Sequence, residues 1–443
     1  MAASTRPNIL FVTAEDICAH LGCYGAPDAI TPNLDRFAAE AVRFTNVFSV
    51  HPCCSPSRSC LATGVYPTRL GSFQHRARMW VSPDEVRCMT SLLREAGYYA
   101  FNGMKGGSDK TDYNFPPRDE PWDARGSQEI EWRNRRAEQP FFGQVNLFRT
   151  HQSQYGRRRP DDPDPHRTHD PADVHLPPYH PDTPAVREIW AEYHDRMTEM
   201  DEQFGRLLEM LEADGLANNT IVIFIGDNGM GIPAGKIWLW EQGLHVPMII
   251  RIPERWQHLQ TTEPGSRDDR LVSFLDVAPT VLALCGVTMP NTMQGHPFLS
   301  SGTTERDTCF AARDFHDGAD FDTSRAVRNR RWHYVRNFMP HQGWDPILYS
   351  WSRAPYMLTE WLAAAEQGAV DNMRQGCFFA TEKPVEELYD VQNDPDCMHN
   401  LADRPEHADT LEQMRTRCED WMRDNGDLGL LSQYELYSRA EKK

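Results

Sequence analysis

The sequence predicts an α/β fold in which a mostly parallel β-sheet is covered by helices. Three observations support this prediction: short apolar runs with strand character, longer stretches with helical spacing of apolar residues, and the alternation of the two through the N-terminal part of the chain. Parallel strands need long crossover connections, which helices usually supply, and such sheets are buried on both faces. With 443 residues the chain is long enough for two or three units of ordinary domain size.

The expected elements follow one another in order along the chain. Short apolar runs predict strands at 8–13, 98–101, 141–148 and 221–225. Apolar residues at intervals of three or four predict helices at 34–42, 92–96 and 186–211. The stretch 157–184 is dense in proline, aspartate, histidine and arginine, which predicts a long loop. Helices therefore separate most of the strands, as a mostly parallel sheet requires.

The character of the chain changes after about residue 305. The segments 326–328 and 332–335 resemble strands of a smaller antiparallel sheet, and 411–421 has the spacing of a closing helix. We therefore divide the chain into an α/β domain, 1–305, and a C-terminal α+β subdomain, 306–443. We expect the subdomain to complete one wall of the site and to be the region for contacts between copies in a homo-oligomer.

The net charge limits the partners. The chain has 46 lysines and arginines against 64 aspartates and glutamates, a formal charge of −18. A negative field repels nucleic acids and anionic membranes, so we expect neither as a partner. An anionic substrate needs a pocket that is locally cationic.

The cysteines and the N-terminus indicate a reducing compartment. Eleven cysteines are an odd number, and they lack the spacing of a disulfide scaffold. Residues 1–6 lead into an apolar run without a long hydrophobic segment or a small-residue cleavage site. We therefore expect a cytoplasmic protein, although a trimmed secretion signal would leave the same start.

Polar side chains follow four of the expected strands. They are Glu15, Asp16, Lys105, His151, Asp227 and Asn228. Each alone has an ordinary explanation, such as a solvated acidic pair or a turn. The carboxyl ends of parallel strands converge on one crevice, however, so we expect these groups to meet. Three carboxylates and one amide oxygen are ligands suited to Ca²⁺ or Mg²⁺.

A cysteine motif is the most specific feature of the chain. Cys54-Ser55-Pro56-Ser57-Arg58 is followed at fixed spacing by Leu61, Thr63 and Gly64. The ordinary interpretation is a buried thiol beside a proline turn. The whole string resembles the signature of the sulfatase family, in which this cysteine is oxidised to formylglycine. The hydrated aldehyde of formylglycine is the nucleophile that attacks sulfur.

The resemblance extends from residue 7 to about residue 401. It is carried in family order by Pro7-Asn8-Ile9-Leu10, Thr31-Pro32-Asn33-Leu34-Asp35, Gly226-Asp227-Asn228-Gly229, Gly235-Lys236, Val246-Pro247, Glu387-Leu388-Tyr389-Asp390 and Asn393-Asp394-Pro395. Within the type I sulfatases, the heparan N-sulfatase (sulfamidase) branch is nearest, through Leu176-Pro177-Pro178-Tyr179 and Pro181-Asp182-Thr183-Pro184. The resemblance implies an alkaline-phosphatase-like fold with a smaller C-terminal antiparallel subdomain.

The resemblance also implies roles for the matching residues. The cation, Ca²⁺ or alternatively Mg²⁺, would be bound by Glu15, Asp16, Cys54, Asp227 and Asn228. Arg58 would hold the formylglycine hydrate, Lys105 and Lys236 would bind sulfonyl oxygens, and His151 would protonate the leaving atom. Such fixed positive charges offset the repulsion between an anionic sulfate ester and its nucleophile. The implied partners are a small anionic sulfated substrate, such as a sulfated sugar, and a maturase that generates the formylglycine.

The chain departs from the family pattern at two positions. Glu15 stands where the family usually has Asp, and its longer side chain can still reach a Ca²⁺ of flexible coordination. Gly107 stands where the family has the His that helps to expel sulfate; Asp112 or His75 are candidates to replace it. Lys110 competes with Lys105 for the cationic role, and we favour Lys105 because it directly follows the expected strand.

Three functions are compatible with these observations. The first is a hydrolase of a sulfate ester or sulfamate. The second is a phosphonate monoester or phosphodiester hydrolase, because related enzymes use the same formylglycine and cation on phosphorus. The third is a catalytically impaired, sulfatase-like binding protein, which the absent His would permit. Trp238 and Trp240, beside Lys236, are either core packing or a surface on which a sugar stacks.

Overall fold

The structure is a computed structural model that describes residues 6–441 except 77–85, 116, 118, 157–166, 261, 300–304, 315–321, 345–354 and 371–375. Its centre is an eight-stranded sheet with the order β4-β3-β5-β1-β6-β7-β2-β8. Only β7 runs antiparallel to its neighbours among these strands. The prediction of a mostly parallel sheet is therefore confirmed.

The strands of this sheet come from the first two thirds of the chain. Their bounds are β1 Asn8–Ala14, β2 Val42–Phe48, β3 Tyr99–Asn102, β4 Ala124–Arg125, β5 Phe141–Leu147, β6 Thr220–Gly226, β7 His245–Arg251 and β8 Arg267–Ser273. The four apolar runs that predict strands correspond to β1, β3, β5 and β6. The other four strands were not predicted: polar side chains interrupt β2 and β8, a proline lies within β7, and β4 has only two residues.

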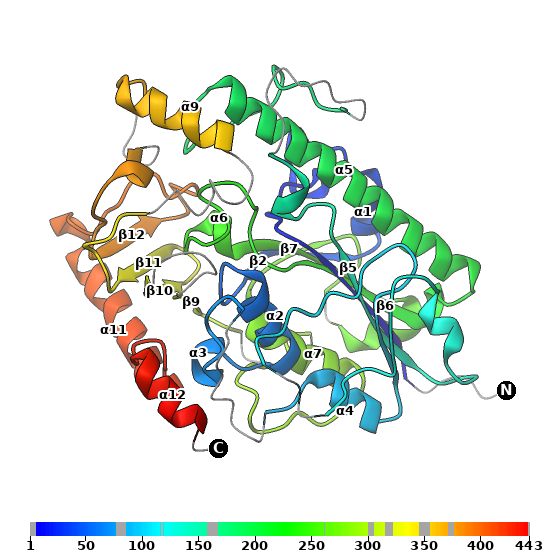
Figure 1. Cartoon of the computed structure of the whole chain (residues 1–443). Helices are drawn as coiled ribbons and strands as arrows, with labels where there is room; N and C mark the ends of the chain where they lie inside the picture. Colours follow the sequence, from blue (N-terminus) through cyan, green and yellow to red (C-terminus); the bar gives the residue numbers. More distant parts are fainter. Residues whose placement is uncertain are drawn as a thin grey trace.

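Helices cover both faces of the sheet (Figure 1). On one face lie α1 (Pro32–Ala39) and α5 (Pro184–Ala213), which contact each other; on the other lie α2 (Cys54–Thr63), α4 (Met89–Glu95) and α7 (Val277–Leu284). Successive side chains of a strand point to opposite faces. In β1, accordingly, Leu10 and Val12 pack with the α1 and α5 layer, whereas Ile9 and Phe11 pack with the other layer.

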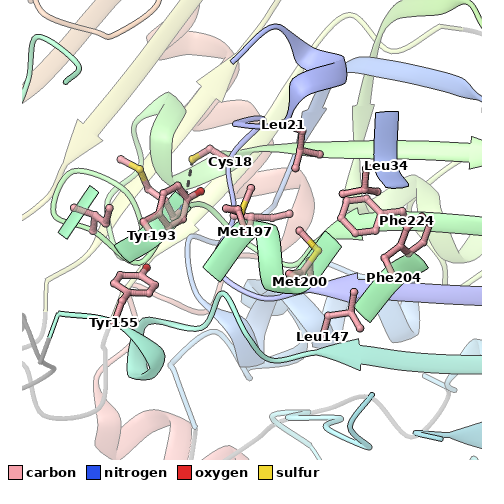
Figure 2. Packing of buried hydrophobic residues seen from close by; sticks show 14 of the residues in the cluster. Cys18, Leu21, Leu34, Leu147, Tyr155, Tyr193, Met197, Met200, Phe204 and Phe224 are labelled. Atoms are coloured by element: carbon pink, nitrogen blue, oxygen red, sulfur yellow. Dashed lines mark hydrogen bonds between the residues drawn. The ribbon is translucent and has the colours of Figure 1, made fainter. Parts of the chain in front are cut away.

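The longest helix, α5, spans the first layer. Thr183 caps it by accepting a hydrogen bond from Val186 N, and Pro184 occupies the first helical position, where a missing N–H costs nothing. Its apolar side chains face the sheet; Figure 2 shows Met197, Met200 and Phe204 among them. The predicted helix, 186–211, is therefore confirmed, and the helix in the structure is two residues longer at each end.

A second, four-stranded antiparallel sheet lies at the side of the first (Figure 1). Its strands are β9 Cys309–Arg313, β10 Ser324–Arg328, β11 Trp332–Asn337 and β12 Glu386–Asp390, in the order β12-β11-β10-β9. One face packs against α11 (Ala408–Asn425), through Val327, Tyr334 and Met414. The other packs against the part of the chain that carries the large sheet, where Ala326 and Val335 join a cluster with Phe48 and Leu244.

The remaining helices are short or peripheral. They are α3 Pro67–Leu70, α6 Glu241–Leu244, α9 Pro355–Glu366 and α12 Gln433–Glu441. In the part of the chain that the structure describes, no helix combines the length and apolarity needed to cross a bilayer.

Candidate active site

Three neighbouring strands end level with one another at one edge of the large sheet. Ala14, at the end of β1, lies beside Leu147 of β5 and Gly226 of β6. The backbone N–H of Asp227 donates to Ala14 O at 3.0 Å, and that of Glu15 donates to Leu147 O at 3.2 Å. The acidic pair after β1 and the acidic residue after β6 therefore lie next to each other, so the structure brings these predicted site residues together.

Helix α2 begins at the same edge and presents Cys54 there. All ten residues of α2 are buried, and the Ser57 hydroxyl donates to the carbonyl oxygen of Asp227, so the first turn is held against the loop after β6. The Cys54 sulfur lies 3.8 Å from Asp16 Oδ1. Burial raises the pKa of the Cys54 thiol to about 12, and the nearby lysine charges offset this only in part. An unmodified Cys54 is therefore a neutral thiol at neutral pH.

Asp16 is held by groups from three separate segments. Its backbone is in the left-handed region, with φ of 51°, and its N–H donates to Asp227 Oδ1 at 3.0 Å. Its carboxylate accepts from Lys236 Nζ at 2.9 and 3.0 Å, from Asn228 Nδ2 at 2.9 Å and from the backbone of Gln152 at 2.9 Å. Burial opposes ionisation of Asp16, but the Lys236 charge and these hydrogen bonds outweigh it and lower its pKa. Backbone strain at such a position is typical of functional sites.

A chain of polar contacts joins Arg58 to the acidic residue after β1. The Arg58 guanidinium lies 2.8 Å from Asp227 Oδ2 and also donates to Asn146 Oδ1. Asn146 Nδ2 donates to Glu15 Oε1, and Lys110 Nζ lies 2.5 Å from Glu15 Oε2. Arg58, Glu15 and Asn146 are buried, and the Lys110 side chain is 20% exposed. Positive and negative groups therefore alternate through this cluster, and buried charges need such pairing.

Lys110, not Lys105, reaches this cluster. Lys105 is exposed, and its side chain makes no hydrogen bond or ion pair with any residue that the structure describes. The geometry therefore favours Lys110 over Lys105 for the cationic role. After β3 the chain folds back on itself through a β-bridge between Met104 and Gly107. A second β-bridge then pairs it with the end of β5. Lys105 is therefore nearer to β3 in sequence, but Lys110 is nearer to the cluster in space.

His151 follows β5 and turns its ring toward the acidic pair. Its Nε2 lies 3.8 Å from Glu15 Oε2 and 3.9 Å from Asp16 Oδ2, and its ring stacks on Phe148 with centroids 4.8 Å apart. The backbone N–H of Ser153 donates to His151 Nδ1 at 3.2 Å. Because that N–H can only donate, the neutral ring carries its proton on Nε2, which faces the cluster. Burial lowers the pKa of His151 to about 4.

The segment at Gly107 has no room for the histidine that is usual in the family. A Cβ on Gly107 would lie 2.1 Å from the Val145 side chain, so this backbone path requires glycine. Of the two candidate replacements, Asp112 lies near the cluster, with Oδ2 3.7 Å from Lys110 Nζ. His75 is buried in the turn after α3.

The cluster offers several potential ligand atoms for a cation. Glu15, Cys54 and His151 place one potential ligand atom each within 4.8 Å of the others. The side-chain oxygen of Asn228 is buried and accepts no hydrogen bond from the residues that the structure describes, although it belongs to a predicted ligand. A buried oxygen without a donor is costly unless a further partner, such as a cation, satisfies it.

The sequence analysis missed Asn146, which links Arg58 to Glu15. A signal was present, because Asn146 is a polar residue in a mostly apolar strand, one residue before its end. Trp238 and Trp240 are about 1% exposed and stack on each other with centroids 6.2 Å apart, so they are core packing and not a sugar-stacking surface.

Comparisons with known proteins agree with this geometry. The family model "Sulfatase" matches residues 7–287, and the model "N-sulphoglucosamine sulphohydrolase, C-terminal" matches residues 234–376. The chain is 35% identical to an ulvan-active sulfatase from Formosa agariphila, over 98% of this chain and 78% of that protein. It is 28% identical to N-sulphoglucosamine sulphohydrolase from Homo sapiens, over 95% of this chain and 91% of that protein.

Solved structures share the fold. A structure described as a complex with its substrate, D-glucosamine-2-N,6-O-disulfate, matches with a TM-score of 0.67 at 18% identity, over 96% of this chain and 99% of that one. Phosphonate monoester hydrolase from Silicibacter pomeroyi matches with a TM-score of 0.68 at 18% identity, over 96% and 97% of the two chains. The alkaline-phosphatase-like fold expected from the sequence is therefore confirmed. Together with the family model over most of its length, these matches show that the chain belongs to the sulfatase family and is a sulfuric ester hydrolase.

Proposed function

We propose that the protein hydrolyses a sulfate ester or sulfamate of a sugar, with formylglycine formed from Cys54 and with one divalent cation, Ca²⁺ or Mg²⁺. The observation that carries the proposal is the position of Cys54. It stands at the start of a buried helix, 3.8 Å from the Asp16 carboxylate, and the charges of Lys110 and Lys236 act directly on its sulfur. The hydrated aldehyde would supply one hydroxyl to attack sulfur and a second whose deprotonation releases sulfate.

The cationic side chains would bind the sulfonyl group. Lys236 is buried and forms an ion pair with Asp16, and Lys110 forms an ion pair with Glu15. An anionic ester brings negative charge that develops further on the transferring oxygens, and fixed cations in a buried site stabilise it without reorganising. Arg58, held between Asp227 and Asn146, would orient the hydrate.

Glu15, Asp16, Asp227 and Asn228 would hold the cation together with the modified Cys54. Support comes from the unsatisfied Asn228 oxygen and from the crowding of carboxylates at one sheet edge. In this position the cation would neutralise charge on the sulfate oxygens.

His151 would give a proton to the leaving oxygen or nitrogen. It would do so from its protonated form, in which Nδ1–H can donate to Ser153 Oγ and Nε2–H faces the acidic pair, so that loss of the Nε2 proton leaves a neutral ring. The bond from sulfur to the leaving atom would break as that atom takes the proton. The His151 side chain is 15% exposed, so the leaving group can extend past it toward solvent.

Asp112 is our candidate for the second proton transfer, in place of the absent histidine. Its Oδ2 is buried, accepts no hydrogen bond from described residues, and lies 3.7 Å from Lys110 Nζ. The residue also has φ of 52°, an unusual backbone conformation for a residue other than glycine. A carboxylate there can take the proton of the second hydroxyl.

The proposal of a sugar substrate rests on the relatives. One acts on ulvan, one on N-sulphoglucosamine, and one is solved with a glucosamine disulfate. The experiment is to coexpress the chain with a formylglycine-generating maturase, confirm conversion of Cys54 by intact-mass analysis, and measure sulfate release from a panel of sulfated sugars and p-nitrophenyl sulfate.

The same preparation tests the alternatives. Turnover of phenyl phosphonate that exceeds turnover of every sulfate ester would favour a phosphonate monoester or phosphodiester hydrolase. Cys54 that remains unmodified after coexpression, with no turnover of either class, would favour a binding protein on this fold.

A further inference from the structure

A pocket adjoins the catalytic cluster on the side of α5. It has a volume of about 400 Å³ and is bounded by the loop after β3, the loop after β5 and the C-terminal half of α5. Its lining includes Gly107, Asn146, Phe148, Arg149 and Arg206. The volume is within the range of roughly 300–1,000 Å³ that is typical of small-molecule sites.

Two residues that line the pocket also contact residues of the catalytic cluster. Asn146 lines the pocket and also binds Glu15 and Arg58 of the catalytic cluster. Phe148 lines the pocket and stacks on the ring of His151, the proposed proton donor. A leaving group that accepts a proton from His151 is therefore next to the entrance of this pocket.

Glycines shape the pocket at the position where the chain departs from its family. Gly106 has φ of 97°, and Gly107 lies so close to Val145 that it cannot carry a side chain. The loop therefore contributes backbone alone to the lining. This path places the loop against β5 and leaves the space over Asn146 open.

The chemistry of the lining suits an anionic sugar. Arg149 and Arg206 are half exposed, and each has one carboxylate partner at a distance, Glu199 at 3.4 Å and Glu202 at 3.5 Å. Exposed pairs of this kind contribute little, so both guanidinium groups remain available to an incoming anion. Phe148 is 39% exposed, so part of its ring is available to the apolar face of a ligand.

We propose that this pocket is the binding subsite for the sugar unit next to the one that carries the scissile sulfate. Arg149 and Arg206 bind an anionic group of that unit, a carboxylate or a second sulfate, and Phe148 supports its apolar face. The inference rests on the proposed function, and it narrows the substrate from a sulfated monosaccharide to an anionic oligosaccharide. It also explains how a chain with a net charge of −18 provides a local cationic surface for its substrate.

The test compares binding and turnover in the double variant Arg149→Ala, Arg206→Ala. Arg439→Ala is the matched control, because Arg439 is also half exposed and, like Arg206, pairs within its helix, with Glu435 at 2.8 Å, but it lies in α12. Binding of a native heparin-derived tetrasaccharide, its carboxyl-reduced form and its desulfated form is measured by calorimetry in a Cys54→Ala background. Turnover of p-nitrophenyl sulfate is measured with Cys54 intact.

We expect the double variant to weaken binding of the native tetrasaccharide by roughly tenfold to a hundredfold, as lost charge-assisted hydrogen bonds at half-exposed positions would do. The control should bind as the parent does. If the carboxyl-reduced form binds the parent and the double variant equally, the arginines bind a carboxylate. If the desulfated form does so, they bind a sulfate. Equal binding of the native tetrasaccharide to the parent and the double variant would overturn the subsite, and so would an equal loss on p-nitrophenyl sulfate. Absence of all sulfate turnover in the parent would contradict the proposed function instead, since the binding comparison does not depend on turnover.

Discussion

Replacing Lys110 by alanine should impair catalysis far more than replacing Lys105. Lys110 Nζ lies 2.5 Å from the fully buried Glu15 carboxylate and acts on the Cys54 sulfur, whereas the Lys105 side chain is exposed and outside the cluster. Loss of one preorganised electrostatic group at a reacting centre typically reduces kcat by about 10²–10³. We expect that range for Lys110→Ala and a change within about twofold for Lys105→Ala, since exposed substitutions usually have small effects.

The same substitution should also destabilise the fold. Breaking a buried ion pair costs about 3–5 kcal/mol. The Lys110 side chain is 20% exposed and Glu15 keeps its hydrogen bond from Asn146, so we expect a smaller loss of about 1–3 kcal/mol in the free energy of unfolding. Lys110→Arg, which keeps the charge, should recover part of both losses.

The assay is kcat/KM on p-nitrophenyl sulfate with maturase-treated protein, alongside urea unfolding of each variant. Intact-mass analysis of each preparation separates a defect in turnover from a defect in Cys54 conversion. If Lys105→Ala lost as much activity as Lys110→Ala, or more, the placement of Lys110 in the site would be refuted.

Four further outcomes are expected. Cys54→Ala should lose activity by orders of magnitude, whereas Cys53→Ala should keep most of it; equal losses would argue against Cys54 as the modified residue. Chelation should abolish turnover and Ca²⁺ or Mg²⁺ should restore it, while Asp227→Ala should lose bound metal, as elemental analysis would show; unchanged metal content would contradict the ligand set. His151→Ala should slow a sugar sulfate by roughly 10²–10⁴-fold and p-nitrophenyl sulfate by less, because the phenolate needs little protonation; equal losses on both substrates would mean that the proton comes from elsewhere. Asp112→Asn, nearly isosteric, should slow the release of sulfate and leave a pre-steady-state burst of nitrophenol; a steady rate equal to that of the parent would exclude Asp112 from proton transfer.

The strands at the centre of the sheet could be predicted from sequence because both of their faces are buried. β1, β5 and β6 lie side by side between two helical layers, and such strands consist of nearly continuous apolar residues. β2 and β8 are the last two strands on one side of the sheet, where burial is incomplete and polar residues interrupt the apolar ones. Their pairing depends on contacts distant in sequence, which local patterns do not contain.

The acidic residues of the site could also be predicted from sequence, because their positions depend on strand ends. Glu15, Asp16, Asp227 and Asn228 directly follow β1 and β6, and parallel strands that end in register bring such residues together. Cys54 was predicted from its motif, and the start of α2 places it beside them.

The choice between two lysines was decided only by the tertiary structure. Lys105 lies between the end of β3 and the bend at Gly106, whereas Lys110 comes after the bend. The bend exists because glycines permit a positive φ and a close approach to β5, and it turns Lys105 outward while Lys110 returns to Glu15. Asn146 became part of the site for a related reason: its side chain is useful only because Arg58 and Glu15, distant in sequence, lie on either side of it. The sequence by itself thus determined which chemical groups the protein has and at which sheet edge they lie, and the path of the connecting loops decided which of them meet.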